Sequence, residues 1–237
     1  MNLLVDLGNT RAKAYVDDVH GPVELANEAN VAALLDVLER GQNSYHRVLV
    51  CSVINDAPWH DRLLRLAPQV VFLSASMPLP IRLNYDTPLT LGADRIAAVA
   101  GAWALQPGNA ALVIDMGTAI TYDVIDAAGC YQGGNIAPGL RLRLEALHEK
   151  TGRLPQVSPE KPVSLIGIST DTAILNGVMQ GIRFEIEGYR RALSKKYRGI
   201  LTFLTGGDAK FFEISAKSGI FVVPNLTAIG LSSIINH

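Results

Sequence analysis

A short strand-and-turn pattern occurs twice in this chain and limits the folds open to it. Asp6-Leu7-Gly8-Asn9-Thr10 follows an apolar run at residues 3–5, and Asp115-Met116-Gly117-Thr118 follows an apolar run at residues 111–114. In each copy a strand ends in a carboxylate, a glycine allows a tight turn, and hydroxyl or amide donors follow, a combination suited to metal and phosphate. One copy alone indicates no more than a β-turn. Two copies predict two similar half-domains that face one nucleotide.

Length and composition agree with a two-part globular protein. The 237 residues suffice for one large domain or two, and the duplicated turn favours two, residues 1–108 and 109–237. Hydrophobic residues make up 49% and charged residues 18% of the chain, which indicates a large core. Strands alternate with helices after an opening hairpin, so we predict an α/β fold with mixed sheets. The final helix, residues 225–235, is apolar and free to pack back on the N-terminal half.

The same numbers argue against several classes of protein. A net charge of −1 offers no basic field for nucleic acid. The first motif begins at Asp6, too early for a secretory signal, and no apolar run approaches the roughly 20 residues needed to cross a bilayer. Cys51 and Cys130 form no Cys-x-x-Cys pair, and the five histidines lack ligand spacing. We therefore expect a cytoplasmic protein without nucleic acid or membrane partners.

The periodicity of apolar residues predicts the elements between the motifs. Residues 133–139, with their glycine pair, are expected to bring the backbone close to a ligand and to open the next helix. Ser169 is expected to cap the long helix that follows. The predicted helices are residues 31–38, 59–66, 92–105, 140–149 and 170–189, and the predicted strands after the first hairpin are residues 48–53, 70–73, 111–114, 120–125 and 201–205.

The two turns are suited to phosphoryl transfer. The chain has neither a Gly-x-x-x-x-Gly-Lys-Ser/Thr loop nor a Gly-x-Gly-x-x-Gly helix start, so hairpin phosphate clamps remain. Asn9, Thr10 and Thr118 supply hydrogen-bond donors, and Asp6 and Asp115 supply hard oxygen ligands for a metal. Lys13 supplies a cation near the first turn, although an exposed strand lysine explains that residue equally well. Transfer of a phosphoryl group requires this kind of charge neutralisation and positioning.

A third motif, Leu91-Gly92-Ala93-Asp94-Arg95, offers a base for the attacking hydroxyl. Asp94 lies early in a predicted helix whose continuation is wholly apolar, so its carboxylate is expected at the edge of a cleft. The alternative for Asp94 is an acid favoured by the helix dipole. Arg95 is either an ion-pair partner within the fold or an anchor for a substrate carboxylate.

Together these motifs resemble the type III pantothenate kinases, of the acetate and sugar kinase, heat-shock chaperone and actin superfamily. The resemblance spans nearly the whole chain and implies two ribonuclease H-like half-domains that flank a nucleotide cleft. The Gly-Ala-Asp-Arg motif distinguishes this family from the rest of the superfamily, so it is the motif that indicates the substrate. The matching motifs, in order, are Asp6-Leu-Gly-Asn-Thr-Arg-Ala-Lys13, Leu91-Gly-Ala-Asp-Arg95, Asp115-Met-Gly-Thr-Ala-Ile-Thr121, Gly133-Gly-Asn-Ile-Ala-Pro-Gly139, Ser169-Thr170 with Gly177, and Thr205-Gly-Gly-Asp-Ala209.

The resemblance also implies roles for single residues. Asp94 is the implied proton acceptor, and Asp115 the implied ligand of a monovalent cation, K⁺ or NH₄⁺; Mg²⁺ is expected to accompany ATP. The implied ATP-binding residues are Asp6, Leu7, Gly8, Asn9, Thr10, Arg11, Ala12, Lys13 and Thr118, and the implied pantothenate-binding residues are Tyr85, Gly92, Ala93, Asp94, Arg95 and Thr170.

The implied activity is the ATP-dependent phosphorylation of pantothenate to 4'-phosphopantothenate, the first step of coenzyme A biosynthesis. The family resemblance implies a homodimer, and Leu140-Arg-Leu-Arg-Leu144 and Gly177-Val-Met-Gln-Gly181 are candidate contacts that serve equally well as core. The alternative is a regulatory accessory protein of the same family with secondary or lost kinase activity. That class predicts a lost base or phosphate turn, whereas Asp94 and both turns are present.

Overall fold

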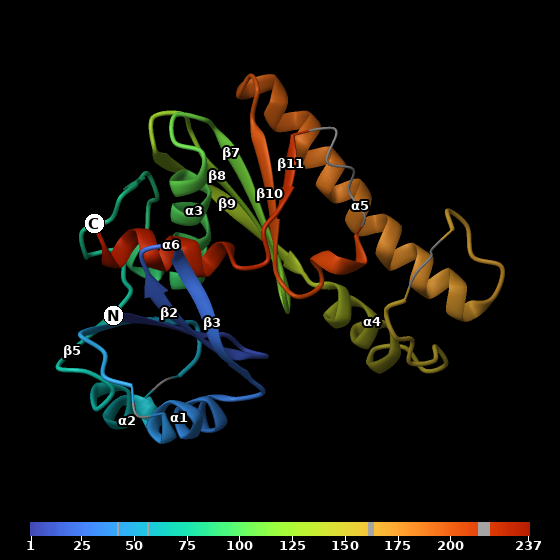
Figure 1. Cartoon of the computed structure of the whole chain (residues 1–237). Coiled ribbons are helices and arrows are strands. Elements are labelled where there is room, and N and C mark those ends of the chain that lie inside the picture. The colour runs from blue at the N-terminus through green and yellow to red at the C-terminus, as the bar shows by residue number, and fades with distance from the viewer. Residues whose placement is uncertain (42, 56, 161–163, 213–218) are drawn as a thin grey trace. The chain divides into compact units, whose positions relative to one another are not determined.

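The computed structural model describes residues 1–41, 43–55, 57–160, 164–212 and 219–237 (Figure 1). The chain forms two compact units. Unit 1 comprises Met1–Gly108, Gly129–Gln132 and Asn225–His237, and unit 2 comprises Asn109–Ala128 and Gly133–Pro224. Among the described residues, no helix has both the length and the apolar character needed to span a membrane.

Unit 1 is built on a five-stranded sheet with the order β3-β2-β1-β4-β5. The central strand β1 runs antiparallel to β2 and parallel to β4. Its strands are β1 (Asn2–Leu7), β2 (Ala12–Asp18), β3 (Gly21–Glu28), β4 (Arg47–Ser52) and β5 (Gln69–Phe72), with the short β6 (Arg82–Leu83) outside this sheet. Its helices are α1 (Val31–Arg40), α2 (His60–Leu64), α3 (Ala93–Leu105) and α6 (Leu226–Ile235).

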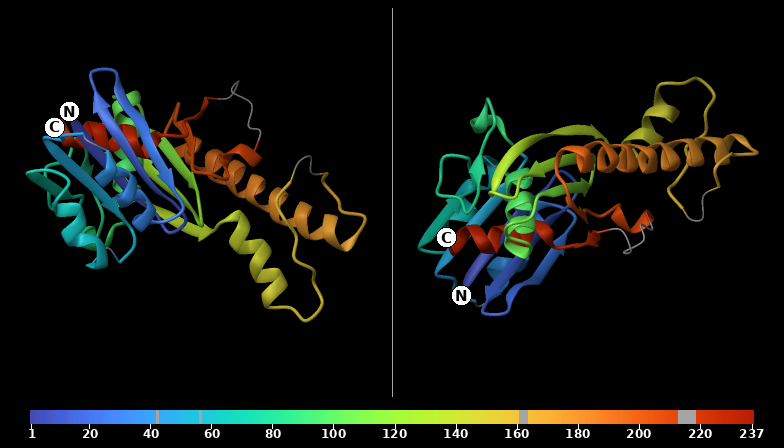
Figure 2. Two further views of the ribbon diagram at one scale, coloured as in Figure 1. Left: turned by 60° about the horizontal axis from the view of Figure 1, so that its bottom comes forward. Right: turned by 90° about the horizontal axis from the view of Figure 1, so that it is seen from above.

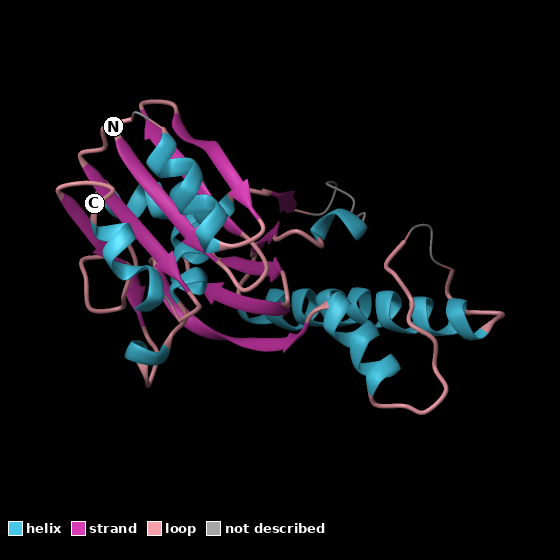
Figure 3. Cartoon of the chain, turned by 90° about the horizontal axis from the view of Figure 1, so that it is seen from below, coloured by secondary structure: helices cyan, strands magenta, loops and turns pink. Residues whose placement is uncertain are grey.

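Helix α1 forms because its apolar residues recur at helical spacing and its start is capped. The Asn30 side chain accepts a hydrogen bond of 2.9 Å from the backbone N–H of Ala33, which satisfies one of the unpaired donors of the first turn. The buried face of α1 joins the core with the inner face of β1, β2 and β4. Figure 3 shows this layering of helices on strands.

Helices α3 and α6 of unit 1 approach each other closely enough for their backbones to touch. A Cβ added at Gly230 would overlap the carbonyl oxygen of Ala97, and a Cβ at Gly101 would overlap that of Leu226. Only glycine at both positions permits this approach. Helix α6 therefore packs on the helix that begins with Ala93, Asp94 and Arg95, although it follows unit 2 in the sequence.

Unit 2 repeats the plan of unit 1. Its strands are β7 (Ala111–Met116), β8 (Ala119–Ile125), β10 (Leu201–Thr205), β11 (Ile220–Val222) and the part of β9 (Cys130–Pro138) from Gly133 onward. The full sheet has the order β11-β10-β7-β8-β9-β6, and β6 and the first residues of β9 belong to unit 1. Strand β7 runs antiparallel to β8 and parallel to β10, as β1 does to β2 and β4. The predicted α/β fold with two mixed sheets is thereby confirmed, and the two turns occupy equivalent positions.

Two helices complete unit 2, α4 (Leu140–Glu149) and α5 (Thr170–Lys196), which lie alongside each other in Figure 2. Helix α5 is capped as predicted by Ser169, whose side chain accepts a hydrogen bond from the backbone N–H of Thr172 in a capping box. Buried residues of both helices pack on β7, β8 and β10 to form the core of this unit.

Strands β3, β6, β9 and β11 were not predicted from the sequence. Strand β3 begins with Gly21-Pro22 and exposes most of its central residues, so it lacks the alternation that marks a half-buried strand. Residues 133–138, which are expected to bring the backbone close to a ligand, continue β9, and Gly133 at φ 93° is accommodated within the strand.

Candidate active site

In unit 1 the first predicted motif forms the turn of the β1–β2 hairpin. The backbone N–H of Gly8 donates to the carbonyl oxygen of Arg11 at 3.0 Å, and Asp6 and Lys13 are directly opposite each other across the strands. Asn9 and Thr10 are exposed at the tip of this turn. Leu7 and Ala12, both predicted to bind ATP, are buried in the core, so their side chains face away from any ligand at the turn.

The side chain of Arg11 is held by strand β3. Its Nε donates to the Asn27 side-chain oxygen at 2.8 Å, and its Nη2 donates to the Asn27 carbonyl oxygen at 2.6 Å. This fork of two hydrogen bonds ties the hairpin turn to the neighbouring strand. Arg11 therefore stabilises the shape of the turn in this structure.

The ionised form of the Asp6 carboxylate is destabilised by its surroundings. Burial raises the pKa of Asp6 to about 6; the charge of Lys13 opposes this rise and the charge of Asp94 adds to it. The charge of Asp94, at the start of α3, therefore acts on the carboxylate of Asp6 on β1 within unit 1. Two acids and one lysine in a partly dry environment would favour an incoming cation or a cation-bound phosphate.

Asp94 is held at the start of α3, in the first turn. Its Oδ1 accepts a hydrogen bond of 2.8 Å from the backbone N–H of Arg95. A Cβ at Gly92 would lie 2.5 Å from that oxygen, so any other residue there would force the carboxylate to shift. The Gly-Ala-Asp-Arg motif thus fixes the direction of a half-buried carboxylate whose charge acts on Asp6.

Arg95 is buried and lies among two tyrosines of unit 1. Its Nη2 donates to the hydroxyl oxygen of Tyr131 at 2.8 Å, and its Cζ lies 5.9 Å from the ring centre of Tyr85 and 6.0 Å from that of Tyr131. The two rings are 5.8 Å apart and tilted by 52°. The structure thus brings together Tyr85 and Arg95, both predicted, and Tyr131, which sequence reasoning missed.

In unit 2 the second motif forms the equivalent turn between β7 and β8. The backbone N–H of Gly117 donates to the carbonyl oxygen of Ala119 at 3.0 Å, and Thr118 is exposed. The backbone N–H of Gly139, at the start of α4, donates to the carbonyl oxygen of Thr118 at 2.9 Å. A Cβ at Gly139 would overlap Gly117 and Thr118, which explains the glycine there.

Asp115 lies against the turn that follows β10. Gly206, at φ 90°, is so close that a Cβ there would overlap Asp115 Oδ1 and the Met116 backbone. The same turn contains Asp208, whose backbone N–H donates to the carbonyl oxygen of Met116 at 3.0 Å. The turn after β10, which contains Gly206 and Asp208, therefore packs directly against the end of β7, where Asp115 lies.

Asp208 and Arg141 form an ion pair next to this turn, a contact that the sequence did not predict. Arg141 Nε lies 3.3 Å from Asp208 Oδ1. Burial raises the pKa of Asp208, and the charge and hydrogen bond of Arg141 oppose that rise. The pair links the first turn of α4 to the Gly206-Gly207 turn. Among the described residues, no group of three or more His, Cys, Asp or Glu side chains could hold a metal ion.

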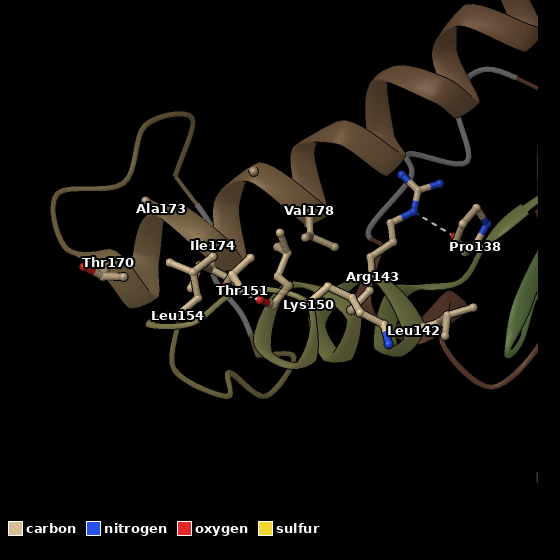
Figure 4. A pocket seen from close by; sticks show the side chains of 13 residues that line it. Pro138, Leu142, Arg143, Lys150, Thr151, Leu154, Thr170, Ala173, Ile174 and Val178 are labelled. Atoms are coloured by element: carbon tan, nitrogen blue, oxygen red, sulfur yellow. Dashed lines mark hydrogen bonds between the residues drawn. The ribbon is translucent and has the colours of Figure 1, made fainter.

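Thr170 lies apart from these residues of unit 2, at an apolar groove of about 930 Å³ between α4 and α5 (Figure 4). Leu142 is exposed along this groove, whereas Leu140 and Leu144 are buried in the core. Met179 is also fully buried, so for Met179, Leu140 and Leu144 the core alternative is correct. The groove is lined by Pro138, Leu142, Arg143, Ala146, Leu147, Lys150, Thr151, Leu154, Thr170, Ala173, Ile174, Gly177 and Val178.

Solved structures support the fold. A Campylobacter jejuni protein described as a conserved Baf family transcriptional activator superposes with a TM-score of 0.63 at 23% identity, covering 99% of this chain and 97% of that one. The activator of 2-hydroxyisocaproyl-CoA dehydratase from Clostridium difficile superposes with a TM-score of 0.51 at 14% identity, covering 99% and 93%. At these identities the similarity concerns the fold alone.

Sequence comparison is more specific. A relative from Bacteroides fragilis named type III pantothenate kinase is 45% identical and covers 100% of this chain and 98% of its own length. Relatives with the same name from Phocaeicola vulgatus and Cytophaga hutchinsonii are 43% and 40% identical, again over 100% of this chain and 98% and 99% of theirs. The type III pantothenate kinase family model matches residues 2–192. The chain belongs to the type III pantothenate kinase family.

Proposed function

We propose that this protein transfers the γ-phosphoryl group of ATP to the primary hydroxyl of pantothenate, the first step of coenzyme A biosynthesis. The observation that carries the proposal is the carboxylate of Asp94, which is fixed at the start of α3 and whose charge acts on Asp6, the partner of Lys13 across the hairpin. A phosphoryl transfer enzyme needs a group that accepts the proton of the attacking hydroxyl next to groups that neutralise phosphate charge. Cytoplasmic location is part of the proposal.

The residues divide the work according to their positions. Asp94 accepts the hydroxyl proton as the new oxygen–phosphorus bond forms, and the bond from the γ-phosphorus to the bridging oxygen of ADP breaks. Asn9, Thr10 and Thr118 offer donors to phosphate from the two hairpin turns. Arg95 and Tyr85 hold pantothenate, with Arg95 directed at its carboxylate. The accessory-protein alternative is less favoured because the base and both turns are intact.

Mg²⁺ is expected to arrive with ATP, and Asp6 fits its requirements. Magnesium in nucleotide enzymes keeps several waters and is held by one or two carboxylates together with the phosphates. Asp6 supplies such a carboxylate, and its raised pKa indicates a charge that its surroundings leave undercompensated. When bound, the ion would neutralise phosphate charge; Lys13 contributes a second positive charge near the same turn.

Asp115 is proposed to support a monovalent cation, K⁺ or NH₄⁺. Unlike Asp6, it has no lysine opposite it in the hairpin, where its partner is Thr121. It lies against the bare backbone of Gly206. We expect activity to rise when Na⁺ is replaced by K⁺ or NH₄⁺, and Asp115→Ala to abolish that difference; initial rates at equal ionic strength measure it. Equal rates in Na⁺ and K⁺ for the wild type would contradict a dedicated site.

A homodimer is proposed, with the α4–α5 groove in the contact. Leu142 exposes 42% and Phe184 58% of their surface on these helices, and Ile166 and Ile168, before α5, expose 72% and 96%. A Cβ at Gly177 would meet open space beside the groove, so a second copy could approach the α5 backbone there. A stable contact between two copies should bury more than roughly 1,000 Å² in total.

Substitution of Gly177 tests this contact. Gly177→Glu adds a charge in open space, so it should leave the fold intact and convert the dimer to a monomer of 25.5 kDa. Gly188→Glu, on the same helix and also facing open space, is the matched control and should remain dimeric. Light scattering coupled to size exclusion reports the mass. A wild-type protein that is monomeric and fully active at the same dilution would rule the dimer out.

A coupled assay tests the function itself. With ATP, Mg²⁺, K⁺ and pantothenate, the wild-type protein should produce ADP and a phosphorylated pantothenate in equal amounts. ADP formed without pantothenate would indicate an ATPase instead. No product in K⁺ or NH₄⁺ buffers, from a protein that binds ATP, would favour the accessory-protein alternative.

A further inference from the structure

We infer that Tyr131 is a positioning residue that orients Arg95 and Tyr85 for the carboxylate of the substrate. Tyr131 lies on β9 and outside the motifs that identify the family. This inference rests on the proposed function, because it concerns the side of the site where pantothenate is proposed to bind.

The backbone of Tyr131 sets the place of Tyr85. Strand β6 pairs in parallel with the first residues of β9, Arg82 with Cys130 and Leu83 with Tyr131. The backbone N–H of Asn84 then donates to the carbonyl oxygen of Tyr131 at 3.0 Å. Because Tyr85 directly follows Asn84, the β6–β9 pairing positions the Tyr85 ring next to the Tyr131 ring.

The side chain of Tyr131 sets the direction of Arg95. Tyr131 is fully buried, and its hydroxyl oxygen accepts a hydrogen bond from Arg95 Nη2 at 2.8 Å. A guanidinium is planar, so fixing one nitrogen fixes the plane in which its other donors point. The two tyrosine faces near Arg95 Cζ add cation–π attraction. A planar, oriented guanidinium favours a planar two-oxygen anion such as a carboxylate.

The Tyr131→Phe substitution tests the contribution of the hydroxyl group separately from that of the aromatic ring. The Phe variant retains the packing against Tyr85 and loses the hydrogen bond to Arg95. Since hydrogen bonds to charged groups are among the stronger ones, we expect KM for pantothenate to rise roughly 10-fold, with kcat and the KM for ATP unchanged. The matched control is Tyr122→Phe: the Tyr122 hydroxyl is buried and has no hydrogen-bond partner among the described residues, so kinetics should not change.

A substrate without a carboxylate distinguishes positioning from a general structural role. Pantothenyl alcohol has a hydroxymethyl group where pantothenate has its carboxylate. Tyr131→Phe should lower kcat/KM for pantothenate roughly 10-fold while leaving that for the alcohol unchanged, so the preference for the anion falls by that factor. An equal loss for both substrates, or no loss for either, would overturn the inference.

Nuclear magnetic resonance of the substrate-free protein tests the same contact without reference to turnover. The Nη signals of Arg95, assigned with Arg95→Lys, should show restricted rotation about the Nε–Cζ bond in the wild type and faster rotation in Tyr131→Phe. If pantothenate is not a substrate but Arg95 rotation depends on Tyr131, the proposed function fails and the positioning role stands. Free rotation of Arg95 in the wild type would contradict the positioning role.

Discussion

Replacement of Asp94 by Asn is expected to slow the phosphorylation of pantothenate by about 10²- to 10⁴-fold, the range for a positioned general base. Asn preserves the shape of the side chain and its amide oxygen can still accept from the Arg95 backbone N–H, so the start of α3 should stay folded. What is lost is the group that takes the hydroxyl proton. Single-turnover measurements isolate this step from product release.

The control for this substitution is Asp61→Asn. Asp61 lies in the first turn of α2, also in unit 1, so it shares the helix-end electrostatics of Asp94 without the neighbouring Asp6. We expect Asp61→Asn to leave the rate unchanged. Equal rates for wild type and the Asp94 variant would show that Asp94 serves only the helix end.

Replacement of Asp6 by Asn is expected to stabilise the ligand-free protein at neutral pH while impairing the use of ATP. The pKa of Asp6 is raised from 3.8 to about 6, so the folded protein binds this proton more tightly than the unfolded chain. Wild-type stability should therefore fall as pH rises from 4 to 6, by up to about 3 kcal/mol. Asn does not titrate and avoids this loss, although it also forgoes the attraction to Lys13.

Urea unfolding at pH 4 and pH 7.5 measures the effect. The two proteins should differ little at pH 4, and the Asn variant should be more stable at pH 7.5. Asp61→Asn, at an exposed carboxylate, should show no such pH-dependent gain. An Asp6 variant that is less stable than the wild type at pH 7.5 would contradict the proposed strain at this carboxylate.

Much of the fold follows from local sequence signals. Helix α4 has the predicted bounds, because Gly139 allows the close start and polar residues follow its end. Helix α1 extends the prediction by two residues to Arg40. Strands β3 and β9 could not be predicted because their pairing with β2 and β8 supplies the stability that their glycine, proline and polar residues lack on their own.

The residues of the candidate site likewise fall into those that the sequence predicts and those that only the tertiary structure brings together. Asp6–Lys13 and Gly92–Arg95 are contiguous motifs, so spacing alone brings their members together. Tyr131 meets Arg95 only through the β6–β9 pairing and α3, and Arg141 meets Asp208 only through the packing of α4 on the turn after β10. Such contacts join residues far apart in sequence, and no local pattern encodes them.

Helix α6 is translated last, but it packs on α3 in unit 1, so unit 1 cannot finish folding until the whole chain has been made. A ribosome translates every residue proposed for the site, and all of unit 2, before it reaches Leu226. Until then α3 lacks the helix whose Gly230 packs against Ala97, so the segment that begins with Ala93, Asp94 and Arg95 remains uncovered. Unit 2 can therefore fold first during translation, whereas unit 1 can complete its core only after α6 has been translated. A nascent chain would carry the full set of catalytic side chains before it could hold them in place.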